Sequence, residues 1–417
     1  MTALTGWRDV TLGDLEQDSG GTIQTGPFGS QLHMSDYSDA GTPVVMPTNI
    51  RDLRISTNGI ARVSQEHVER LARHRLRAGD IVYSRRGDVE KCALITHEQA
   101  GWLCGTGCLL VRVGGPRVDE RCLAYLLSLP DTRTWISQHA VGATMLNLNT
   151  ELLREVPVTL PPIEEQRGIA ATLGALDDKI ESNRRSVELI EHLLVLEFQN
   201  LLSAESVDYR PLSELTSITK GVSYKSADLQ PSTTALVTLK SFDRNGGYKA
   251  DGLKQYLGPY KSQQVIEPGE VVVAQTDLTQ GAEVVGRAVR VPADSSAEVL
   301  VASLDLVIVR SSDDITPEYL IGVLVDESFR AHCRSRTSGT TVLHLAGDAI
   351  PTYLAPIVSA TAQHSFSALS RPLIARADSL NTEITKLASL RDALLPELLS
   401  GRTRVPEARE AVQEVVA

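Results

Sequence analysis

One stretch, residues 160–202, constrains the fold more than any other part of the sequence. It opens with Leu160-Pro161-Pro162 and then continues for about 40 residues without another proline. Apolar residues recur within it at spacings of three and four, the heptad pattern of a helix that packs on another helix. With a rise of about 1.5 Å per residue, such a helix is roughly 60 Å long. A single apolar stripe of that length needs a partner helix.

A second stretch, residues 362–399, offers that partner within the same chain. Its large apolar residues are spaced by seven, although charged residues interrupt the neighbouring stripe. We expect an intramolecular, antiparallel coiled coil, and a core element of a helical bundle is the alternative. Asn183 falls on a core position, where a buried amide costs stability but can fix register. The expected core positions are Ile169, Leu173, Leu176, Ile180, Asn183, Val187, Ile190, Leu194, Phe366, Leu369, Leu373, Leu380, Leu387 and Leu394.

Length and composition are those of a multidomain globular protein. The 417 residues predict two to four domains, and no apolar run is long enough to span a membrane. The N-terminus has no basic segment followed by an apolar one, so we expect a cytoplasmic protein. Five cysteines at scattered positions do not form a disulfide framework. Cys104 and Cys108 lack a second pair of ligands, so we interpret them as core residues and predict no metal site.

Net charge neither supports nor excludes a nucleic-acid ligand. The chain carries a formal charge of −11, and no segment of it is basic overall. Phosphate contacts are local, however, because charges are screened over about 8 Å at physiological salt. A basic face on an acidic body therefore stays a hypothesis.

The second half of the chain repeats the order of the first. Residues 76–95 and 265–289 both place Gly and an acid before a Val/Ile-rich strand. A further strand follows in each half, then a short helix, in which Tyr125 is matched with Tyr319. The turn at 139–149 is echoed at 336–346, and each half ends in a proline-containing entry to its long helix. This order indicates a tandem duplication of an α/β unit followed by a long helix.

Several of these motifs resemble those of the specificity subunit of type I restriction-modification systems. The matching residues are Thr25-Gly26-Pro27-Phe28-Gly29-Ser30, Gly79-Asp80-Ile81-Val82, Gly142-Ala143-Thr144, Leu160-Pro161-Pro162 and Glu165-Gln166. The similarity covers nearly the whole chain and ends around Gly401. In the second half Ala355-Pro356 and Gln363 replace the proline and glutamine motif, so there the match depends on the order of elements and on the helix.

The resemblance implies a mixed α/β fold with two tandem target-recognition domains separated by the two long helices. The expected segments are a first target-recognition domain at 1–160, a first long helix at 161–203, a second target-recognition domain at 204–357, a second long helix at 358–400, and a C-terminal tail at 401–417, for which the sequence leaves both order and disorder open.

The resemblance also implies a division of labour. Each domain of the family reads one half of a bipartite site in duplex DNA, and the helices hold the domains apart. The same helices dock two methyltransferase subunits, which bind S-adenosylmethionine and methylate adenine at N6. Motor-nuclease restriction subunits then cleave unmodified DNA. The chain itself is expected to bind no cofactor.

The residues agree with a binding role. The only Pro-Pro pair, Pro161-Pro162, begins a helix and is not part of a methyltransferase tetrad, and neither a Gly-rich cofactor loop nor a phosphate-binding loop is present. The acidic pair Asp177-Asp178 is interpreted as part of a solvated helix face. We therefore predict no catalytic residue in this chain.

Basic, amide and aromatic residues are the candidates for DNA contact, because Arg can bind guanine or phosphate and Asn or Gln can pair with adenine. For several of them, including the run from Arg70 to Arg77, a solvated surface is the competing interpretation. The predicted DNA-binding residues are Phe28, Ser30, Gln31, Asn49, Arg51, Arg54, Arg85, Arg86, Lys91, Thr144, Tyr224, Lys225, Lys240, Arg244, Thr276, Gln280, Thr340 and Thr341. The alternative function is a coiled-coil scaffold whose α/β domains bind proteins.

Overall fold

The computed structural model describes residues 6–416, except 52, 143–144, 244–246, 278–280, 293–296 and 341. The chain divides into two compact units. Unit 1 combines residues 1–180 with 386–417, and unit 2 comprises residues 181–385. Each unit therefore contains an α/β domain and part of both long helices, α6 (Ile163–Ala204) and α10 (Ala360–Leu399).

Unit 1 is built on two four-stranded sheets. The first has the order β2-β11-β8-β9 and the second β10-β4-β7-β3, in which β10 and β4 are parallel. A short pair, β1 with β12, precedes the start of α6. The strands are β1 (Arg8–Thr11), β2 (Thr22–Thr25), β3 (Tyr37–Ser38), β4 (Thr42–Val45), β7 (Ala61–Val63), β8 (Ile81–Ser84), β9 (Cys92–Leu94), β10 (Leu103–Cys104), β11 (Cys108–Arg112) and β12 (Pro157–Leu160).

Helices cover one face of the first sheet in unit 1. Alternate residues of β8 and β11, including Tyr83 and Leu109, pack with the apolar faces of α3 and α6 in one core. Asp119 begins α3 by accepting the backbone N–H of Cys122 at 2.9 Å. The helices of this unit are α1 (Leu12–Ser19), α2 (Gln65–Arg70), α3 (Glu120–Ser128), α4 (Pro130–His139) and α5 (Thr150–Arg154).

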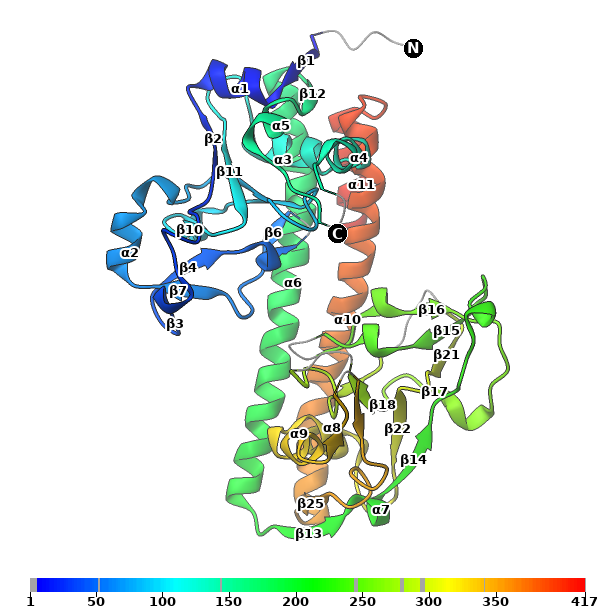
Figure 1. Cartoon of the computed structure of the whole chain (residues 1–417). Helices are drawn as coiled ribbons and strands as arrows, with labels where there is room; N and C mark the ends of the chain where they lie inside the picture. Colours follow the sequence, from blue (N-terminus) through cyan, green and yellow to red (C-terminus); the bar gives the residue numbers. More distant parts are fainter. Residues whose placement is uncertain are drawn as a thin grey trace. The chain divides into compact units, whose positions relative to one another are not determined.

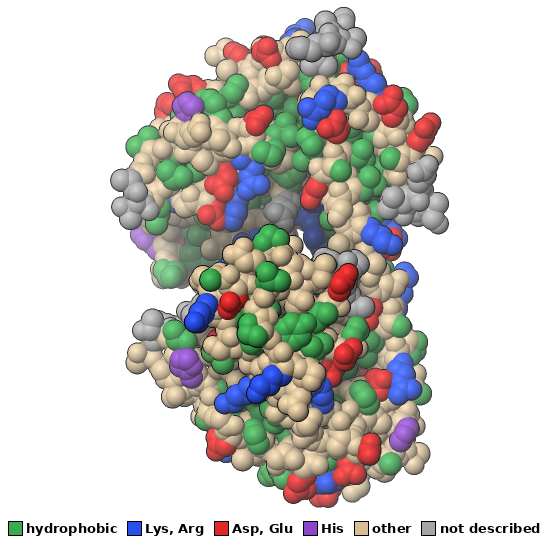
Figure 2. Space-filling model, turned by 90° about the vertical axis from the view of Figure 1, so that its right-hand side faces the viewer, with side chains coloured by type: hydrophobic (Ala, Val, Ile, Leu, Met, Phe, Trp, Pro, Cys, Tyr) green, Lys and Arg blue, Asp and Glu red, His purple; other side chains and the backbone are tan. Residues whose placement is uncertain are grey.

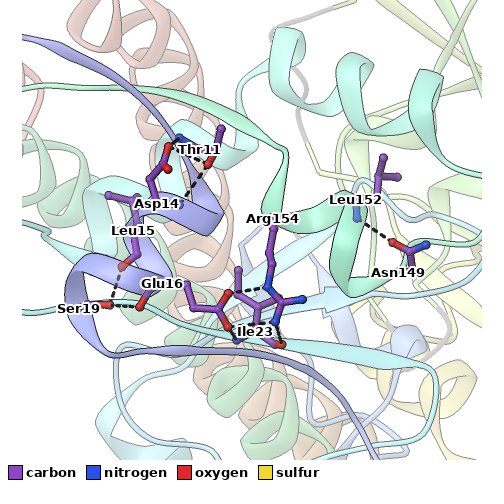
Figure 3. Close-up of polar contacts among 9 residues, drawn as sticks. All are labelled: Thr11, Asp14, Leu15, Glu16, Ser19, Ile23, Asn149, Leu152 and Arg154. Carbon is purple, nitrogen blue, oxygen red and sulfur yellow. Dashed lines mark hydrogen bonds and ion pairs between the residues drawn. The ribbon is translucent and has the colours of Figure 1, made fainter.

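A polar cluster joins the first and last elements of the domain in unit 1 (Figure 3). Arg154, at the end of α5, donates from Nε to Glu16 of α1 at 2.6 Å and from Nη2 to the carbonyl of Ile23 at 2.9 Å. The Glu16 carboxylate also accepts the backbone N–H of Ile23 at 2.6 Å. Bonding to Arg154 holds the pKa of Glu16 below its ordinary value.

Unit 2 repeats this plan. Its sheets have the orders β14-β22-β18-β20 and β16-β15-β21-β17, with β15 and β21 parallel, and β13 pairs with β25 before α10. An additional sheet, β19-β24-β23, is present. The strands are β13 (Asp208–Pro211), β14 (Thr216–Lys220), β15 (Thr234–Val237), β16 (Lys254–Gln255), β17 (Val265–Ile266), β18 (Val271–Ala274), β19 (Thr276–Asp277), β20 (Ala288–Arg290), β21 (Val299–Ala302), β22 (Leu306–Ser311), β23 (Thr337–Ser338), β24 (Leu343–Leu345) and β25 (Leu354–Ile357).

Three helices, α7 (Leu212–Leu215), α8 (Pro317–Val325) and α9 (Glu327–Arg334), complete unit 2. The predicted mixed α/β fold and the internal repeat are confirmed. The tyrosine match needs correction, however. Gln166 accepts the backbone N–H of Asp119 at 2.9 Å and Gln363 that of Thr316 at 3.2 Å, so Asp119 and Thr316, which cap α3 and α8, are equivalent. By that equivalence, Tyr319 and Tyr125 do not occupy the same position, because they lie about one helical turn apart on α8 and α3.

The two long helices pair antiparallel within each unit (Figure 1). In unit 1 the beginning of α6 meets the end of α10, because Ile169 shares a core with Leu398 and Arg391 pairs with Asp177 at 2.9 Å. In unit 2 the end of α6 meets the beginning of α10, where Phe198 and Phe366 lie 5.8 Å apart. The predicted antiparallel pair is therefore present. Within the described residues, no helix has the length and apolarity of a membrane span.

Most expected core positions of the helix pair are buried, but one is not. Leu369 is 43% exposed, because α10 turns Ser367 and Ser370 inward instead. Ser367 donates to the Thr316 hydroxyl at 2.8 Å, which fixes that face. Ile169, Leu173, Leu176, Ile180, Asn183, Phe366, Leu380 and Leu387 are buried, and Val187, Ile190, Leu194, Leu373 and Leu394 are half-buried.

The structure answers one open question and corrects one expectation. The tail at 401–417 contains a helix, α11 (Val405–Val416), in which Ala408 is fully buried in the core of unit 1. Asp177 does not lie on a solvated face, because it accepts the Tyr125 hydroxyl at 2.5 Å and pairs with Arg391. The five cysteines are all buried, in agreement with their interpretation as core residues.

Candidate nucleic-acid interface

Loops from four parts of the sequence meet at one end of the first sheet in unit 1. Gly26, after β2, donates to the carbonyl of Cys108 at 2.9 Å, and Arg85, after β8, donates to that of Gly107 at 2.8 Å. The turn near residue 147 joins them, because Leu148 donates to the carbonyl of Arg85 at 2.9 Å. The structure thus brings together the Gly26 and Gly142 motifs, which are more than 100 residues apart in the sequence.

Phe28 and Arg85 form the exposed part of this end. The guanidinium carbon of Arg85 lies 5.6 Å from the centre of the Phe28 ring, the geometry of a cation–π contact. The Phe28 ring is 50% exposed. An aromatic ring can stack on a base, and a neighbouring guanidinium group can contact a phosphate.

Only glycine fits at position 26. A Cβ at this position would lie 2.1 Å from the carbonyl oxygen of Gly105, so any side chain would push the two loops apart. Gly221 repeats the arrangement in unit 2, where a Cβ would lie 2.0 Å from the carbonyl oxygen of Ser303. Both units therefore hold their first loop against the sheet by close contact of backbones.

Two predicted contacts in unit 1 prove to be structural. Asn49 is 4% exposed, its Oδ1 accepts the backbone N–H of Met46 at 2.9 Å, and its Nδ2 donates to the carbonyl of Ser56 at 3.2 Å. The expectation that Asn49 pairs with adenine is therefore corrected. Gln31 is half-buried, and its Oε1 accepts the backbone N–H of Phe28 at 3.1 Å, which shapes the loop around the exposed ring.

The other predicted residues of unit 1 that the structure describes lie on loops or on the short strands β5 and β6. Ser30 and Arg86 are exposed, and Lys91 forms an ion pair with Asp88. Arg51 and Arg54 lie opposite one another on β5 (Ile50–Arg51) and β6 (Arg54–Ile55). Arg51 is exposed and Arg54 half-buried.

The hairpin that carries Arg51 and Arg54 also contains a strained residue. Leu53 has φ = 64°, a left-handed conformation that a branched side chain rarely adopts. Its carbonyl accepts the backbone N–H of Leu94 at 3.0 Å, which holds the hairpin against β9. Such strain often marks a functional segment.

In unit 2 the structure pairs Tyr224 with a lysine. Lys254 lies 5.6 Å from the centre of the Tyr224 ring and its Nζ is 3.3 Å from the hydroxyl, which it can reach with a hydrogen bond. Lys225 and Lys240 are exposed. Basic and acidic side chains are interspersed on the face drawn in Figure 2.

Thr276 and Thr340 belong to neighbouring parts of unit 2. Thr276 lies on β19, opposite His344 of β24, and its hydroxyl donates to Asp305 at 2.8 Å. Thr340 is exposed and follows β23. Four other predicted contacts, Thr144, Arg244, Gln280 and Thr341, lie outside the described residues.

The glycine turns of the two units are alike. Gly142 has φ = 138° and Gly339 φ = 120°, and a Cβ would lie 2.1 Å from the carbonyl oxygen of Met145 and 2.0 Å from that of Val342. Sequence reasoning missed the guanidinium groups of α9, beside the second of these turns. Arg330 and Arg334 are spaced by four on this helix, and that spacing was the available signal. No group of side chains suited to a metal ion occurs among the described residues.

These features define a class of protein: two related α/β units with different exposed loops, each incorporating part of both long helices. The comparisons with known proteins agree with this class. Residues 6–192 match the family described as Type I restriction modification DNA specificity domain. This match covers less than half of the 417 residues, and it makes the first part of the chain similar to type I restriction-modification specificity subunits.

Individual relatives are distant. The putative type I restriction enzyme MjaX specificity subunit of Methanocaldococcus jannaschii is 28% identical over 156 residues, which are 36% of each chain. The MjaVIII specificity subunit of the same organism is 23% identical over 178 residues, or 40% of each chain. The matches thus span well under half of these relatives' length. The crystal structure of the type I S subunit from M. genitalium shares the fold, with a TM-score of 0.57 at 16% identity, covering 95% of this chain and 97% of that one.

Proposed function

We propose that this chain recognises a sequence in duplex DNA as the specificity subunit of a type I restriction-modification complex. The observation that carries the proposal is the duplicated loop arrangement on two related units, in which Arg85 lies over the exposed Phe28 ring in unit 1 and Lys254 over the half-buried Tyr224 ring in unit 2. Arginine, lysine and aromatic side chains are the groups that contact phosphates and bases.

Each unit would read one half of a bipartite site. The scaffold is common to both units, whereas the exposed loops differ in sequence, so the two half-sites would differ. A helix the length of α6, 42 residues or about 63 Å, can space two readers by more than one DNA turn of about 34–36 Å.

The proposal includes the partners of the family. Two methyltransferase subunits would dock on the long helices, bind S-adenosylmethionine and methylate adenine at N6, and motor-nuclease subunits would cleave unmodified DNA. This chain would contribute recognition and no catalytic group. A cytoplasmic location is part of the proposal.

An exchange of one domain tests the two-reader proposal. Residues 204–357 are replaced by those of a relative, and the methylated motif of the host genome is determined by sequencing. We expect one half-site to change and the other to stay. A simultaneous change of both halves would contradict the proposal.

A helix insertion tests the spacing separately. Two turns are added to α6 near residue 183 and two to α10 near residue 380, so that the pair stays in register. The unread spacer between the half-sites should lengthen while both half-sites are retained. An unchanged spacer would show that the helices do not set the distance.

A protein-binding scaffold is the second candidate, because the chain has no excess of basic residues, with 41 against 52 acidic ones. Size-exclusion chromatography with a methyltransferase subunit, with and without duplex DNA, separates the two. Recognition predicts a ternary complex with DNA, whereas a scaffold predicts a protein complex that DNA does not join.

A further inference from the structure

Three arginine side chains of unit 2 crowd together beside the loop that carries Thr276. Arg287 donates from Nε to the carbonyl oxygen of Glu283 at 2.6 Å, and Arg330 of α9 donates from Nη2 to the same oxygen at 3.0 Å. Arg334, one turn further along α9, and Arg330 both reach the carboxylate of Glu327, at 3.5 and 3.8 Å. We call Arg287, Arg330 and Arg334 the arginine cluster.

The surroundings do not favour three positive charges. Burial, and then the neighbouring guanidinium groups, lower the pKa values of Arg287 and Arg330. The carboxylates of Glu327, Asp243 and Glu283 act in the opposite direction on Arg287, each with a smaller effect than burial and Arg334. Glu327 is 67% exposed, so solvent weakens its pairs with the cluster.

The cluster also has hydrogen-bonding capacity left. The Nε atoms of Arg330 and Arg334 are buried and have no acceptor among the residues that the structure describes. A guanidinium group binds an oxyanion through a fork of two parallel N–H donors, for which Nε and one terminal nitrogen are suited. An anion at the cluster would therefore meet donors as well as charge.

Unit 1 has a site with fewer cations at the equivalent positions. Tyr83 pairs with Cys92 where Val273 pairs with Ala288, so Lys91 is equivalent to Arg287. Arg133, four residues after the N-cap of α4, is likewise equivalent to Arg330 of α9.

Each cation of unit 1 has a carboxylate of its own. Lys91 pairs with Asp88, and Arg133 pairs with Glu90 at 3.7 Å. Ser137 stands where unit 2 has Arg334, so the third cation is a feature of unit 2. The position is thus shared between the units, but only unit 2 gathers three guanidinium groups there.

The arginine cluster lies next to the proposed interface. Asp277, the neighbour of Thr276, accepts the backbone N–H groups of Val284 and Val285 at 2.5 and 3.1 Å, which ties the Thr276 segment to the residues that precede Arg287. At its other end α9 leads into β23 and then to Thr340. The cluster is therefore joined to the segments that carry both predicted contacts.

We propose that the arginine cluster binds a backbone phosphate of the DNA that unit 2 recognises. This inference rests on the proposed function and adds residues that position the duplex without reading its sequence. Neutralising one phosphate releases a condensed counterion, which makes binding steeper in salt. The cluster would thus give unit 2 a larger electrostatic share of binding than unit 1 has.

Arg334 is the residue to change, because it is 37% exposed and forms neither bond to the Glu283 carbonyl. Duplex DNA containing the host's methylated motif is titrated into the complex of full-length chain and methyltransferase subunit between 50 and 200 mM NaCl. For Arg334→Gln we expect weaker binding at low salt and a slope of log K against log[salt] shallower by about 0.9. Arg334→Lys keeps the charge, so its slope should stay close to that of the wild type.

Arg371→Gln is the matched control, since Arg371 is a 66% exposed arginine of unit 2 paired with Glu318 on the other side of α8. It should leave the slope unchanged. Equal slopes for wild type and Arg334→Gln, with DNA still bound, would overturn the inference and leave the proposed function intact.

Inorganic phosphate separates free anion from DNA as the ligand. Thermal unfolding in 0 and 50 mM phosphate, at constant ionic strength, should show a smaller stabilisation of Arg334→Gln than of wild type. If the wild-type complex binds no DNA, the proposed function fails, and the assignment of the cluster to DNA fails with it. A phosphate effect that depends on Arg334 would then identify a site for free phosphate.

Discussion

Units 1 and 2 share a scaffold and differ in what they place on it. In both, a buried glutamine at the start of a long helix joins that helix to the N-cap of a second one, through Gln166 in unit 1 and Gln363 in unit 2. The first sheets of the two units have corresponding orders, and the glycine turns both have a positive φ. The cation–π pairs differ, because unit 1 has Phe28 with Arg85 and unit 2 has Tyr224 with Lys254 at other positions of the fold. After the duplication, the buried scaffold of the two units has thus stayed similar, while the residues on their loops have diverged.

The interiors are not identical either. Phe198 of α6 packs against Gly322 in unit 2, where a Cβ on the glycine would lie 2.5 Å from the ring. By the equivalence of the two helix starts, unit 1 has Leu395 of α10 and Tyr125 at these positions. A large residue on the long helix and a small one on the short helix have been exchanged for the reverse, which keeps the volume of the core roughly constant.

Among the described residues, α11 has no counterpart in unit 2. In unit 1, α11 lies over the start of α6, where a Cβ at Gly168 would approach Val405 to 3.0 Å and Arg404 pairs with Glu165 at 3.0 Å. The equivalent surface of unit 2, on α10, is a shallow depression lined by small residues such as Ala360, Ser365 and Ala368. The first unit is therefore closed by the C-terminus of the chain, and the second is not.

Truncating Phe198, the large residue of the Phe198–Gly322 pair, should have the largest effect on stability. Phe198→Ala removes a 1% exposed ring that contacts Tyr319 and Phe366, and we expect unit 2 to lose about 3–5 kcal/mol of stability. Leu395→Ala, at the partly buried equivalent position, should cost unit 1 about 2 kcal/mol. Native-state hydrogen exchange measures each unit separately. Equal losses in both units would disprove the exchange of volumes.

Acid should weaken unit 1 before unit 2. Burial and the adjacent Arg73 lower the pKa of His74 to about 4, so the folded state keeps this imidazole neutral while the unfolded chain protonates it near pH 6.5. His74 faces the backbone of Thr25, and Gln264, which does not titrate, bonds to the carbonyl of the equivalent Lys220 at 3.3 Å in unit 2. Stability present above pH 6.5 should be lost as the pH falls through 4, by about 3 kcal/mol.

The substitution His74→Gln provides the control for this pH dependence. The substitution gives unit 1 a glutamine, as unit 2 has, and should remove the loss of stability of unit 1 between pH 6.5 and 4. Hydrogen exchange in the two units measures this. A wild-type unit 1 that keeps its stability at pH 4 would show that His74 is protonated in the folded protein.

Adding a side chain at Gly168, where α6 contacts α11, should have a smaller effect on stability, and only in unit 1. Gly168→Val forces Val405 away and should cost about 1–3 kcal/mol, because the side chain overpacks a closed contact. Ser365→Val, at the equivalent and exposed position of unit 2, should change stability by less than about 0.5 kcal/mol. Proteolysis near Arg402 would report release of α11. A cost at Ser365 equal to that at Gly168 would show that a partner also covers the depression.

The sequence predicted the parts of this fold that depend on periodicity. The heptads gave both long helices, and the Gly-acid turns gave β8 and β18, because burial of one face imposes a regular pattern. Leu369 was assigned wrongly for the same reason: the heptad continues through it, but Thr316 of α8 draws Ser367 inward and rotates the buried face. α11 is short and lies after a Gly, so its order depends on tertiary contacts that no local pattern encodes.

The candidate interface was less predictable. Glycine motifs indicated which loops matter, since close backbone contact leaves no alternative residue. Residue type alone could not distinguish Asn49, whose amide is used inside the fold, from Arg85, which faces outward beside Phe28. The arginine cluster was missed because Arg287 and Arg330 are 43 residues apart and meet only at the Glu283 carbonyl.

The smallest expected effect concerns the amide in the helix pair. Asn183 is 3% exposed, and its Nδ2 has no acceptor among the described residues, whereas the equivalent position on α10 is the buried Leu380. Asn183→Leu removes an unsatisfied buried donor and should raise the stability of unit 2 by about 1 kcal/mol, seen as slower hydrogen exchange along residues 181–204. Leu380→Asn, the reverse change, should destabilise the same unit. If Asn183→Leu instead destabilised the pair of α6 and α10, the Asn183 amide would have a partner, such as a buried water. The difference between Asn183 and Leu380 would then stabilise the pair, and it would not be a cost tolerated for register.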